Sequence, residues 1–385
     1  MHLGGLVMGL TKIRLGDYIE RSTVNNSDLK YGIDFIAGVN NQGIFTAPKG
    51  NTEGVDLKPY KIVNNGAFVY NPTRLDLGSI AYRMENLCIV SHLYMVFYLT
   101  EEGKKIIDPL WLFIYFRRAE FCREVTFRNF GSQRPEFNFS DMSDIIIHLP
   151  DIDIQRKFVT VYNAMLANQK MYERGLDDLK LVCDAYIEDL RRGILCEKIG
   201  PFITRQDIRN GVNGTKNVMG VSTSKEFREP TSKVNRNELQ NYKVVKPRQI
   251  SFVQTTHNEK VFCNAFNNTN DDIVVTSVNE VFSTDEEYLL PEYLVMFFNR
   301  TEFDRYARFH SWGSARETFS WDDLIKVEIP IASMEIQRSI VDIYTVYKER
   351  KNINEKLKVQ IKDICPILIK GSIEEARKRG DIFNG

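Results

Sequence analysis

A long internal repeat is the feature that most restricts how this chain can fold. The stretch "GSQRPEFNFSDM" begins at Gly131, and "GSARETFSWDDL" begins at Gly313, 182 residues later. The same offset relates Ile154-Gln155-Arg156 to Ile336-Gln337-Arg338, although it drifts to 184 or 185 between about residues 64 and 100. A period of this length is far too long for a solenoid. The sequence therefore predicts a tandem duplication of a whole domain together with the segment that follows it.

Both halves have the same order of local patterns. Short apolar runs bounded by turn residues predict strands, and a run that opens with proline predicts a helix. The expected strands are 67–82, 88–99, 249–254 and 261–266, followed by 144–150 and 325–330, which each end at a proline; the expected helices are 109–125 and 291–307. The globular part of each half is therefore predicted to be mixed α+β.

Each half then changes to a long helical pattern. Apolar residues alternate steps of three and four from Phe158 to Leu190, and this spacing is typical of a coiled-coil seam, with Gln169 as its polar member. The second half repeats the pattern from Ile336, with a seam at Ile343, Val346, Ile353, Leu357, Ile364 and Ile367, and we expect Pro366 to kink or shorten that helix. Each helix has an apolar stripe to bury, and the other copy is the economical antiparallel partner.

These patterns give a complete expectation for the architecture. We expect an α+β protein with two similar mixed α/β domains and two long antiparallel coiled-coil helices, related by a pseudo-twofold axis. The predicted ranges are 1–150 for the first domain, 151–195 for the first helix, 196–330 for the second domain and 331–385 for the second helix.

The composition limits the function classes and the compartment. Lys+Arg and Asp+Glu both number 51, which argues against a protein that coats polyanions but leaves room for a local basic face. The six cysteines are scattered without a CxxC pair, which fits a reducing cytoplasm rather than a disulfide framework or a zinc site. No apolar run approaches the roughly 20 residues of a membrane-spanning helix.

Catalytic and metal-binding signatures are nearly absent. The stretch "NPTR" (71–74) is superficially similar to the N-P-P-[YF] loop of adenine methyltransferases, but it lacks the second proline and the aromatic residue. A loose PD…DLK nuclease pattern places its second part in the middle of a predicted helix. The five histidines do not have metal-ligand spacing, and no Walker A motif is present. We therefore expect no catalytic centre, no metal site and no cofactor in this chain.

The first candidate for a nucleic-acid surface is the arginine-rich helix end and the loop after it. Glycine and serine allow close approach of the backbone to a phosphate, and arginine suits bidentate contacts with phosphate or guanine. The candidate residues are Arg128, Ser132, Gln133 and Arg134 in the first half and Ser314 and Arg316 in the second. The alternatives are a solvated helix face with local ion pairs and a structural ion pair that joins the loop to the helix.

The second candidate surface consists of polar loops at corresponding places where the two halves diverge. Loops that vary on a shared scaffold commonly carry specificity, and polar side chains of these types read base edges. The candidate residues are Asn71, Arg74, Ser79 and Arg83 in the first half and Thr255, His257, Asn258 and Lys260 in the second. The alternative is that these are ordinary hairpin loops.

Together these features resemble the specificity subunit of Type I restriction-modification systems. The resemblance rests on "FVYNPTRLDLGSIAY" with "VSHLYMVF", on "GSQRPEFNFSDMSDIIIHLPDIDIQRKFV" and "GSARETFSWDDLIKVEIPIASMEIQRSIV", and on the duplicated domain–helix order of almost the whole chain. One departure is "HLPDIDIQ", where the family often has P-P-L-x-E-Q.

The resemblance implies a DNA-recognition role without catalysis. Each globular domain would be a target recognition domain that reads one half of a split, asymmetric double-stranded DNA sequence. The helices would set the unread gap and dock two modification subunits, which hold the methyltransferase chemistry, and a restriction subunit would complete the nuclease. Two other readings stay open: a coiled-coil scaffold whose end domains bind proteins, and a stand-alone DNA methyltransferase or nuclease.

Overall fold

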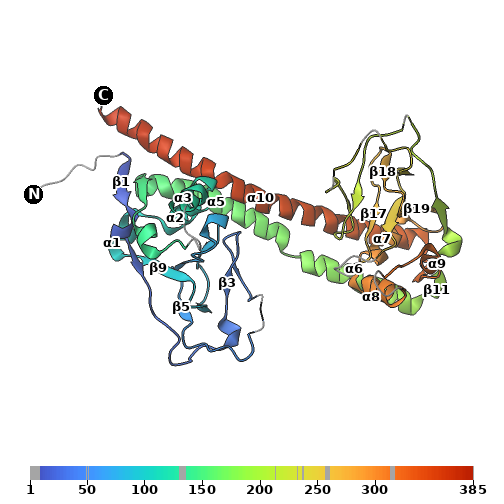
Figure 1. Cartoon of the computed structure of the whole chain (residues 1–385), viewed down its shortest axis with the longest axis horizontal. Coiled ribbons are helices and arrows are strands. Elements are labelled where there is room, and N and C mark those ends of the chain that lie inside the picture. Colours follow the sequence, from blue (N-terminus) through green and yellow to red (C-terminus); the bar gives the residue numbers. More distant parts are fainter. Residues whose placement is uncertain are drawn as a thin grey trace, which may run out of the picture. The chain divides into compact units, whose positions relative to one another are not determined.

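The computed structural model describes residues 9–48, 50, 52–129, 136–212, 214–231, 233–235, 238–255, 261–312 and 317–384, with the backbone alone from 381 onward. The chain divides into two compact units (Figure 1). The first contains Met1–Tyr172 and Ile353–Gly385, and the second contains Glu173–Asn352. Each unit therefore combines one globular domain with parts of two helices that lie far apart in the sequence.

The first unit contains ten strands and, before the C-terminal helix, five α-helices among its described residues. The strands are β1 (Thr11–Arg14), β2 (Ile19–Arg21), β3 (Gly38–Val39), β4 (Phe45–Thr46), β5 (Lys61–Val63), β6 (Phe68–Tyr70), β7 (Ile80–Tyr82), β8 (Cys88–Val90), β9 (Met95–Leu99) and β10 (Ile146–Leu149). The helices are α1 (Glu101–Ile106), α2 (Pro109–Phe116), α3 (Ala119–Arg128), α4 (Phe139–Ser143) and α5 (Ile152–Glu173), with short 3-10 turns at Leu15–Asp17, Ile33–Phe35 and Leu75–Leu77.

The second unit repeats this order. Its strands are β11 (Cys196–Lys198), β12 (Ile203–Gln206), β13 (Gly220–Val221), β14 (Phe227–Arg228), β15 (Lys243–Val245), β16 (Ile250–Val253), β17 (Asn264–Phe266), β18 (Ile273–Val275), β19 (Asn279–Thr284) and β20 (Glu328–Pro330). Its helices are α6 (Leu176–Gly193), α7 (Pro291–Phe298), α8 (Thr301–Phe309) and α9 (Trp321–Leu324), with a 3-10 turn at Gly200–Phe202. The helix α10 (Met334–Asn384) contributes residues to both units.

The sheets have the same topology in the two units. A four-stranded antiparallel sheet has the order β2-β9-β6-β7 in the first unit and β12-β19-β16-β17 in the second. Three two-stranded pairs accompany each sheet: β1-β10, β3-β4 and β5-β8 in the first unit, and β11-β20, β13-β14 and β15-β18 in the second. The registers also correspond, since Phe68 pairs with Phe97 and Ile250 pairs with Phe282. The expected internal repeat of mixed α+β domains is therefore confirmed.

Three of the expected helices are interrupted. The range 109–125 forms two helices that break at Arg117 and Arg118, and the range 291–307 breaks in the same way after Phe298. The long helix expected from 154 to 190 is divided into α5 and α6 at Gly175, which has a φ of +84°. This left-handed conformation suits glycine and interrupts a continuous right-handed helix.

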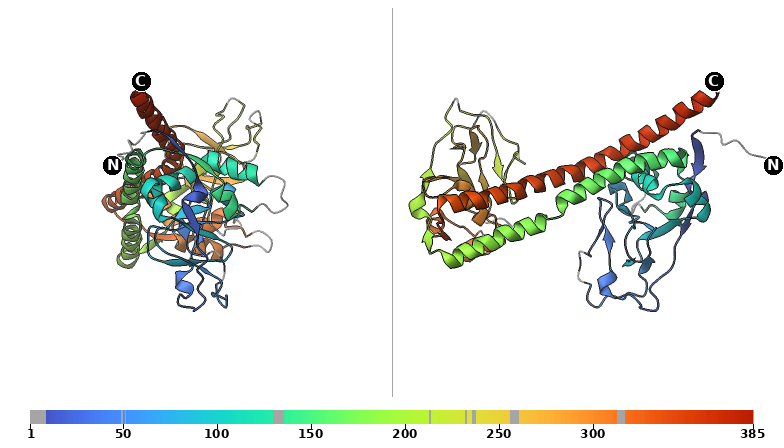
Figure 2. Two further views of the ribbon diagram at one scale, coloured as in Figure 1. Left: turned by 90° about the vertical axis from the view of Figure 1, so that its left-hand side faces the viewer. Right: turned by 180° about the vertical axis from the view of Figure 1, so that it is seen from behind.

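The helix pairing is antiparallel within each unit. In the first unit, α5 runs beside the C-terminal part of α10 (Figure 2). Lys157 of α5 contacts Glu375 of α10 at 2.6 Å, while Gln169 contacts Asn354 at 2.8 Å. In the second unit, Arg350 donates to the carbonyl of Arg174 at 3.4 Å. These pairs run in opposite directions along the two segments, as an antiparallel arrangement requires.

Three of the six seam residues expected for the second helix are exposed. Val346, Ile353 and Ile367 are exposed, whereas the buried residues of α10 are Gln337, Ile340, Asn354, Ile361, Cys365, Leu368, Ile369, Ser372 and Ala376. The assigned helix also continues through Pro366 to Asn384, so this proline does not shorten it. The buried face also includes the polar residues Asn354 and Ser372, which an apolar seam leaves out.

Buried glutamines tie the globular domains to the long helices. Gln155 donates from Nε2 to the carbonyls of Ile106 at 2.8 Å and Pro150 at 2.7 Å, and its Oε1 accepts from the Asp108 N–H at 2.9 Å. Gln337, at the equivalent position, donates to the carbonyls of Tyr288 and Ala332 and accepts from the Leu290 N–H. Each glutamine thus satisfies three backbone groups where a strand gives way to a helix.

Candidate nucleic-acid interface

One hydrogen bond brings the two predicted loop surfaces together in each unit. In the first unit, the Phe137 N–H donates to the carbonyl of Pro72 at 3.1 Å. In the second, the Phe319 N–H donates to the carbonyl of Gln254 at 2.8 Å. Phe137 and Phe319 follow the two Gly-Ser loops, and Pro72 and Gln254 lie in the polar loops that come after β6 and β16. The shared scaffold therefore places both candidate segments side by side at their bases.

The second unit reinforces this junction. Thr255 forms an isolated antiparallel bridge with Thr318, and Trp312 forms another with the same residue. The N–H of Trp312 donates to the Thr318 carbonyl at 3.2 Å, and the Thr318 N–H donates back at 3.0 Å. Thr255 itself is exposed, so its side chain is available beside the two loops.

The predicted residues of the first polar loop have different environments. Arg74 is exposed, and no side-chain partner for it occurs among the described residues. Asn71 is half-buried, and its Oδ1 accepts from the backbone N–H of Thr73 at 3.0 Å and from the hydroxyl of that residue at 2.9 Å. Arg74 is consequently the side chain of this loop that is best placed to reach a ligand.

Ser79 and Arg83 are occupied within the fold. The hydroxyl of Ser79 is fully buried and donates to the carbonyl of Val39 at 3.0 Å. Arg83 donates from Nε to the carbonyl of Asn86 at 2.7 Å, and its guanidinium lies 4.9 Å from the centre of the Phe45 ring. Because Ser79 is fully buried, its hydroxyl cannot contact a ligand at the surface.

The arginines of α2 and α3 are also engaged. Arg117 is buried, because the break between the helices directs its guanidinium toward the carbonyls of Gly78 and Asn41. Burial lowers the pKa of its guanidinium. Arg128 donates to Glu124 at 2.8 Å, an (i, i+4) ion pair of the kind that stabilises a helix surface.

The arginines of the second unit are also engaged in contacts within the fold. Arg300 is largely buried and lies 3.2 Å from Asp184 and 2.6 Å from Glu188, both on α6. Arg305 pairs with Glu302 at 3.1 Å. Among the described residues, Arg128, Arg300 and Arg305 therefore form ion pairs within the fold, as the ion-pair alternative for the arginine-rich helix ends expects.

Exposed aromatic residues stand next to the loops instead. Phe127 is 82% exposed and Phe309 is 83% exposed, and the two occupy equivalent positions at the ends of α3 and α8. Trp312 is also exposed, whereas Phe121 is buried, as expected for a core aromatic. Each of the two rings lies next to an arginine in the sequence, Arg128 after Phe127 and Arg308 before Phe309.

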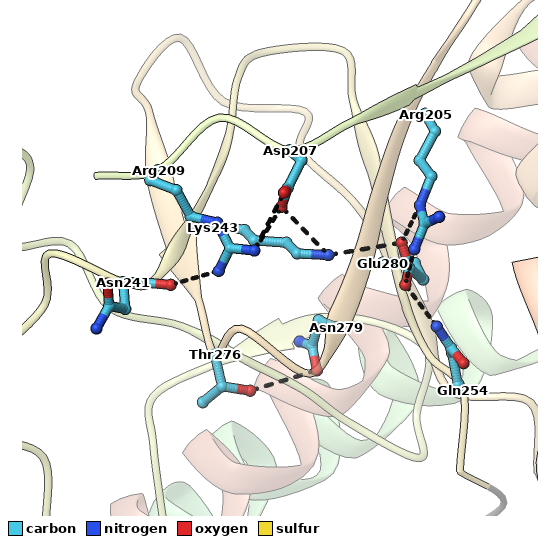
Figure 3. A network of polar contacts seen from close by, with 9 residues as sticks. All are labelled: Arg205, Asp207, Arg209, Asn241, Lys243, Gln254, Thr276, Asn279 and Glu280. Atoms are coloured by element: carbon cyan, nitrogen blue, oxygen red, sulfur yellow. Dashed lines mark hydrogen bonds and ion pairs between the residues drawn. The ribbon is translucent and has the colours of Figure 1, made fainter. Parts of the chain in front are cut away.

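A charged network lies behind the loop junction of the second unit (Figure 3). Glu280 is only 3% exposed and accepts from Arg205 Nε at 2.8 Å and from Arg205 Nη2 at 2.6 Å. Lys243 Nζ lies 3.5 Å from Glu280 and 3.6 Å from Asp207. Burial on its own would raise the pKa of Glu280, but hydrogen bonding to Arg205 and the charge of Lys243 outweigh it, so the pKa is lowered.

The remaining predicted residues lie outside the described part of the chain. They are Ser132, Gln133, Arg134, His257, Asn258, Lys260, Ser314 and Arg316. Among the residues that the structure describes, no cluster of His, Cys, Asp or Glu could hold a metal ion. Over the same residues, no helix combines the length and apolar character needed to cross a membrane.

Comparisons with known proteins agree with this geometry. Residues 10–169 match the model of the family described as "Type I restriction modification DNA specificity domain". No curated protein sequence matches the chain. Among solved structures, the S subunit of a Type I restriction-modification system from M. genitalium is similar at a TM-score of 0.59, with 11% identity over 97% of this chain and 98% of that one.

Two further solved structures are similar to the chain. The HsdS subunit from Thermoanaerobacter tengcongensis has a TM-score of 0.38 and 16% identity, over 95% of this chain and 96% of its own. A chain from a type I R-M system, from work on complex assembly and conformational transition, has a TM-score of 0.44 and 15% identity, over 96% and 97%.

The duplicated topology, the repeated loop junction and the family match point the same way. The M. genitalium S subunit shares the fold over nearly the whole of both chains. Residues 10–169 match the model of the Type I restriction modification DNA specificity domain, and the chain as a whole has the fold of the M. genitalium S subunit.

Proposed function

We propose that this chain is the DNA-binding specificity subunit of a Type I restriction-modification complex. Each globular domain reads one half of a bipartite, asymmetric double-stranded target. The observation that carries the proposal is the repeated junction of two loops, held by Phe137–Pro72 in one unit and Phe319–Gln254 in the other. The scaffold is the same in both units while the loop sequences differ, which is what two different half-sites require.

The proposed contacts divide between positioning and reading. Arg134 and Arg316 contact phosphate or guanine, and the exposed Arg74 and Thr255 lie where a base edge or a phosphate can approach. Ser132, Gln133, Ser314, His257, Asn258 and Lys260 belong to the same two loop sets. Asn71, Arg83 and Arg128 already make contacts within the fold, with Thr73, the Asn86 carbonyl and Glu124 respectively.

The proposal assigns the helices and the partners as well. The paired helices set the unread gap and dock two modification subunits, which supply the methyltransferase chemistry. A restriction subunit joins them to form the nuclease, and the complex works on DNA in the cytoplasm. The chain itself brings no catalytic residue and no cofactor to this assembly.

The test is the methylation pattern that the chain directs. The chain is expressed with its modification subunit in a host without other DNA methylation, and methylated bases are sequenced. We expect one two-part motif with a fixed gap and different halves. Replacing residues 67–136 by the equivalent segment of another specificity subunit changes one half alone. Methylation at a continuous, unsplit motif contradicts the proposal, as does methylation that is unchanged when this chain is omitted.

A further inference from the structure

Gln254 occupies the position where the loops of the second unit meet. Its backbone carbonyl accepts from the Phe319 N–H, and its neighbour Thr255 pairs with Thr318. Its side chain is half-buried and points toward Glu280, as Figure 3 shows. A side chain fixed at this junction lies beside whatever the two loops bind.

Glu280 determines how the amide of Gln254 is oriented. Nε2 of Gln254 donates to Oε1 of Glu280 at 2.5 Å. An ionised carboxylate can only accept hydrogen bonds, so the amide nitrogen must face it and the amide oxygen must face away. One N–H and the Oε1 of Gln254 are left over, and no partner for them occurs among the described residues. This donor–acceptor pair matches N7 and N6 of adenine.

The carboxylate is itself held in one place. Arg205 binds it with two hydrogen bonds, and the buried Lys243 lies on its other side. Lys243 is balanced in turn by Asp207, which also pairs with Arg209 at 2.8 Å. A side chain whose partners are charged and mutually fixed loses little further freedom when it binds, which favours selective recognition.

The first unit keeps the cations of this network but not the carboxylates. Strand registers place Arg21 where the second unit has Arg205, and Lys61 where it has Lys243. In the first sheet Met95 pairs with Tyr70, and at the equivalent place in the second sheet Glu280 pairs with Phe252. Met95 therefore occupies the position of the Glu280 carboxylate. Pro72 replaces Gln254 at the loop junction. The network is therefore a property of the second recognition domain alone.

We propose that Gln254 reads an adenine in the half-site of the second domain and that Glu280 is the positioning residue that orients its amide. The inference rests on the proposed function and deepens it, because it names a reading residue and a base. The first domain, which has Pro72 and Met95 at these positions, uses other side chains for its own half-site.

Two variants test this assignment. Gln254→Met keeps the size of the side chain and removes the donor–acceptor pair. Glu280→Gln keeps the shape but can itself donate a hydrogen bond, so it no longer fixes the orientation of the Gln254 amide. The assembled complex of each variant selects binders from DNA in which the second half-site is randomised, and the bound fraction is sequenced. Both variants are expected to lose roughly tenfold discrimination at the same A·T base pair.

A control variant in the same domain separates orientation from stability. Arg248 binds Glu286 at 2.7 Å and Glu292 at 2.8 Å, and Arg248→Ala removes this charged cluster without touching the network at the loops. We expect its base preferences to equal those of the wild type. The first half-site should remain unchanged in all three variants, which shows that each variant is folded and assembled.

The outcomes distinguish the two proposals. Unchanged discrimination in both variants overturns the role of Gln254, and a loss at a G·C pair overturns the assignment of adenine. Loss in Gln254→Met without loss in Glu280→Gln overturns the positioning role. If the wild-type complex selects no second half-site at all, the proposed function itself fails.

Discussion

Gly43 and Lys225 occupy equivalent positions at the tips of two hairpins, and both have a left-handed backbone, with φ of +72° and +62°. In the first unit, a Cβ at position 43 would lie 2.7 Å from the Ile80 carbonyl and 2.9 Å from a guanidinium nitrogen of Arg117. Arg117 fills this space from the helix side. Glycine is thus required at position 43 by the left-handed backbone and the Ile80 carbonyl, and the Arg117 guanidinium packs into the space that a side chain would take.

In the second unit, the cation comes from the hairpin and reaches toward the helices. Lys225 extends from the hairpin to the carbonyl of Phe298 at 2.7 Å and to Asp304 at 2.8 Å. Asn299 stands where the first unit has Arg117, and it donates to the Tyr344 hydroxyl instead. Burial lowers the pKa of Lys225 in spite of the opposing contact with Asp304. In each unit one buried cation, Arg117 or Lys225, joins the hairpin to the helix. From the sequence alone, such a structural cation cannot be told from a cation that contacts DNA.

The residue scale is where prediction from the sequence was weakest. The polar character of Ser79 indicated a binding surface, but its hydroxyl donates to the Val39 carbonyl inside the fold. Phe127, in contrast, is apolar and yet exposed. Residue type alone does not say which way a side chain faces at a helix end or in a loop, because tertiary contacts decide it.

The loop arginines give the prediction that belongs to this scale. Arg134→Ala and Arg316→Ala are each expected to weaken DNA binding by the assembled complex. A phosphate contact lowers affinity on all sequences and reduces the salt dependence by about one unit of slope. A base contact costs roughly 1–3 kcal/mol on the cognate site alone. Fluorescence anisotropy at several salt concentrations measures both quantities.

Arg128→Ala is the matched control for the loop arginines. Arg128 pairs with Glu124, so its loss is expected to change DNA affinity less than the loss of Arg134. Normal binding by both folded loop variants would show that their arginines are structural.

At the scale of elements, the two glutamines explain why the Ile-Gln-Arg motif occurs twice. Gln155 and Gln337 are fully buried, and each satisfies one N–H and two carbonyls where chain segments converge. A buried backbone group without a partner costs about 1–3 kcal/mol. The motif therefore specifies how each long helix leaves its globular domain.

Substitution of these glutamines should be strongly destabilising. Gln155→Leu or Gln337→Leu leaves three backbone groups without their partner, and we expect a loss of about 3 kcal/mol or more in the free energy of unfolding. Gln360→Leu makes the same change at an exposed position of α10 and should stay within about 0.5 kcal/mol of the wild type. Urea denaturation followed by circular dichroism compares them, and equal losses in the buried and exposed variants would contradict the role assigned to the motif.

The sequence predicted which helices and strands form better than it predicted the residues at which they begin and end. The apolar runs and the prolines at 109 and 291 located most of the strands and the starts of α2 and α7. The sequence did not reveal the break at Arg117, because the helical spacing continues through it. The seam of α10 was partly misplaced, because an apolar pattern leaves out buried polar residues such as Asn354.

The buried pair of Gln169 and Asn354 supports a prediction about that seam. Gln169→Leu or Asn354→Leu leaves the other amide buried without this partner, and each should lower the melting temperature. The double substitution removes both polar groups and should recover much of the loss or exceed the wild type. Buried polar pairs fix the register of coiled coils. Additive losses in the double variant, measured by thermal denaturation, would show that the two amides do not depend on each other.

At the scale of the whole molecule, the chain is two copies of one unit type that share α10. The described residues form no metal cluster, and the sequence has no cofactor loop before "NPTR". We therefore expect the purified chain neither to bind S-adenosylmethionine nor to cleave DNA. Isothermal titration calorimetry checks the first expectation and plasmid incubation the second; a tight stoichiometric S-adenosylmethionine site would contradict the division of labour proposed.

The last prediction concerns the spacing of the half-sites. The two units meet along the sequence at Tyr172–Glu173 and again at Asn352–Ile353. Four residues inserted at both places add about one helical turn, or about 6 Å, to both antiparallel segments without altering contacts inside either unit. A base pair advances about 3.4 Å along the duplex. If the paired helices set the gap, the preferred gap grows by one to two base pairs and both half-sites stay the same.

Plasmids that carry gaps of several lengths measure this preference through their methylation. An insertion of four residues at 172–173 alone is the control, because it displaces one helix against the other and should reduce methylation at every gap length. A double-insertion variant that methylates with the original gap would show that the helices do not set the spacing. A change in the half-site bases would instead show that recognition lies outside the loop junctions, since neither insertion comes near Pro72 or Gln254.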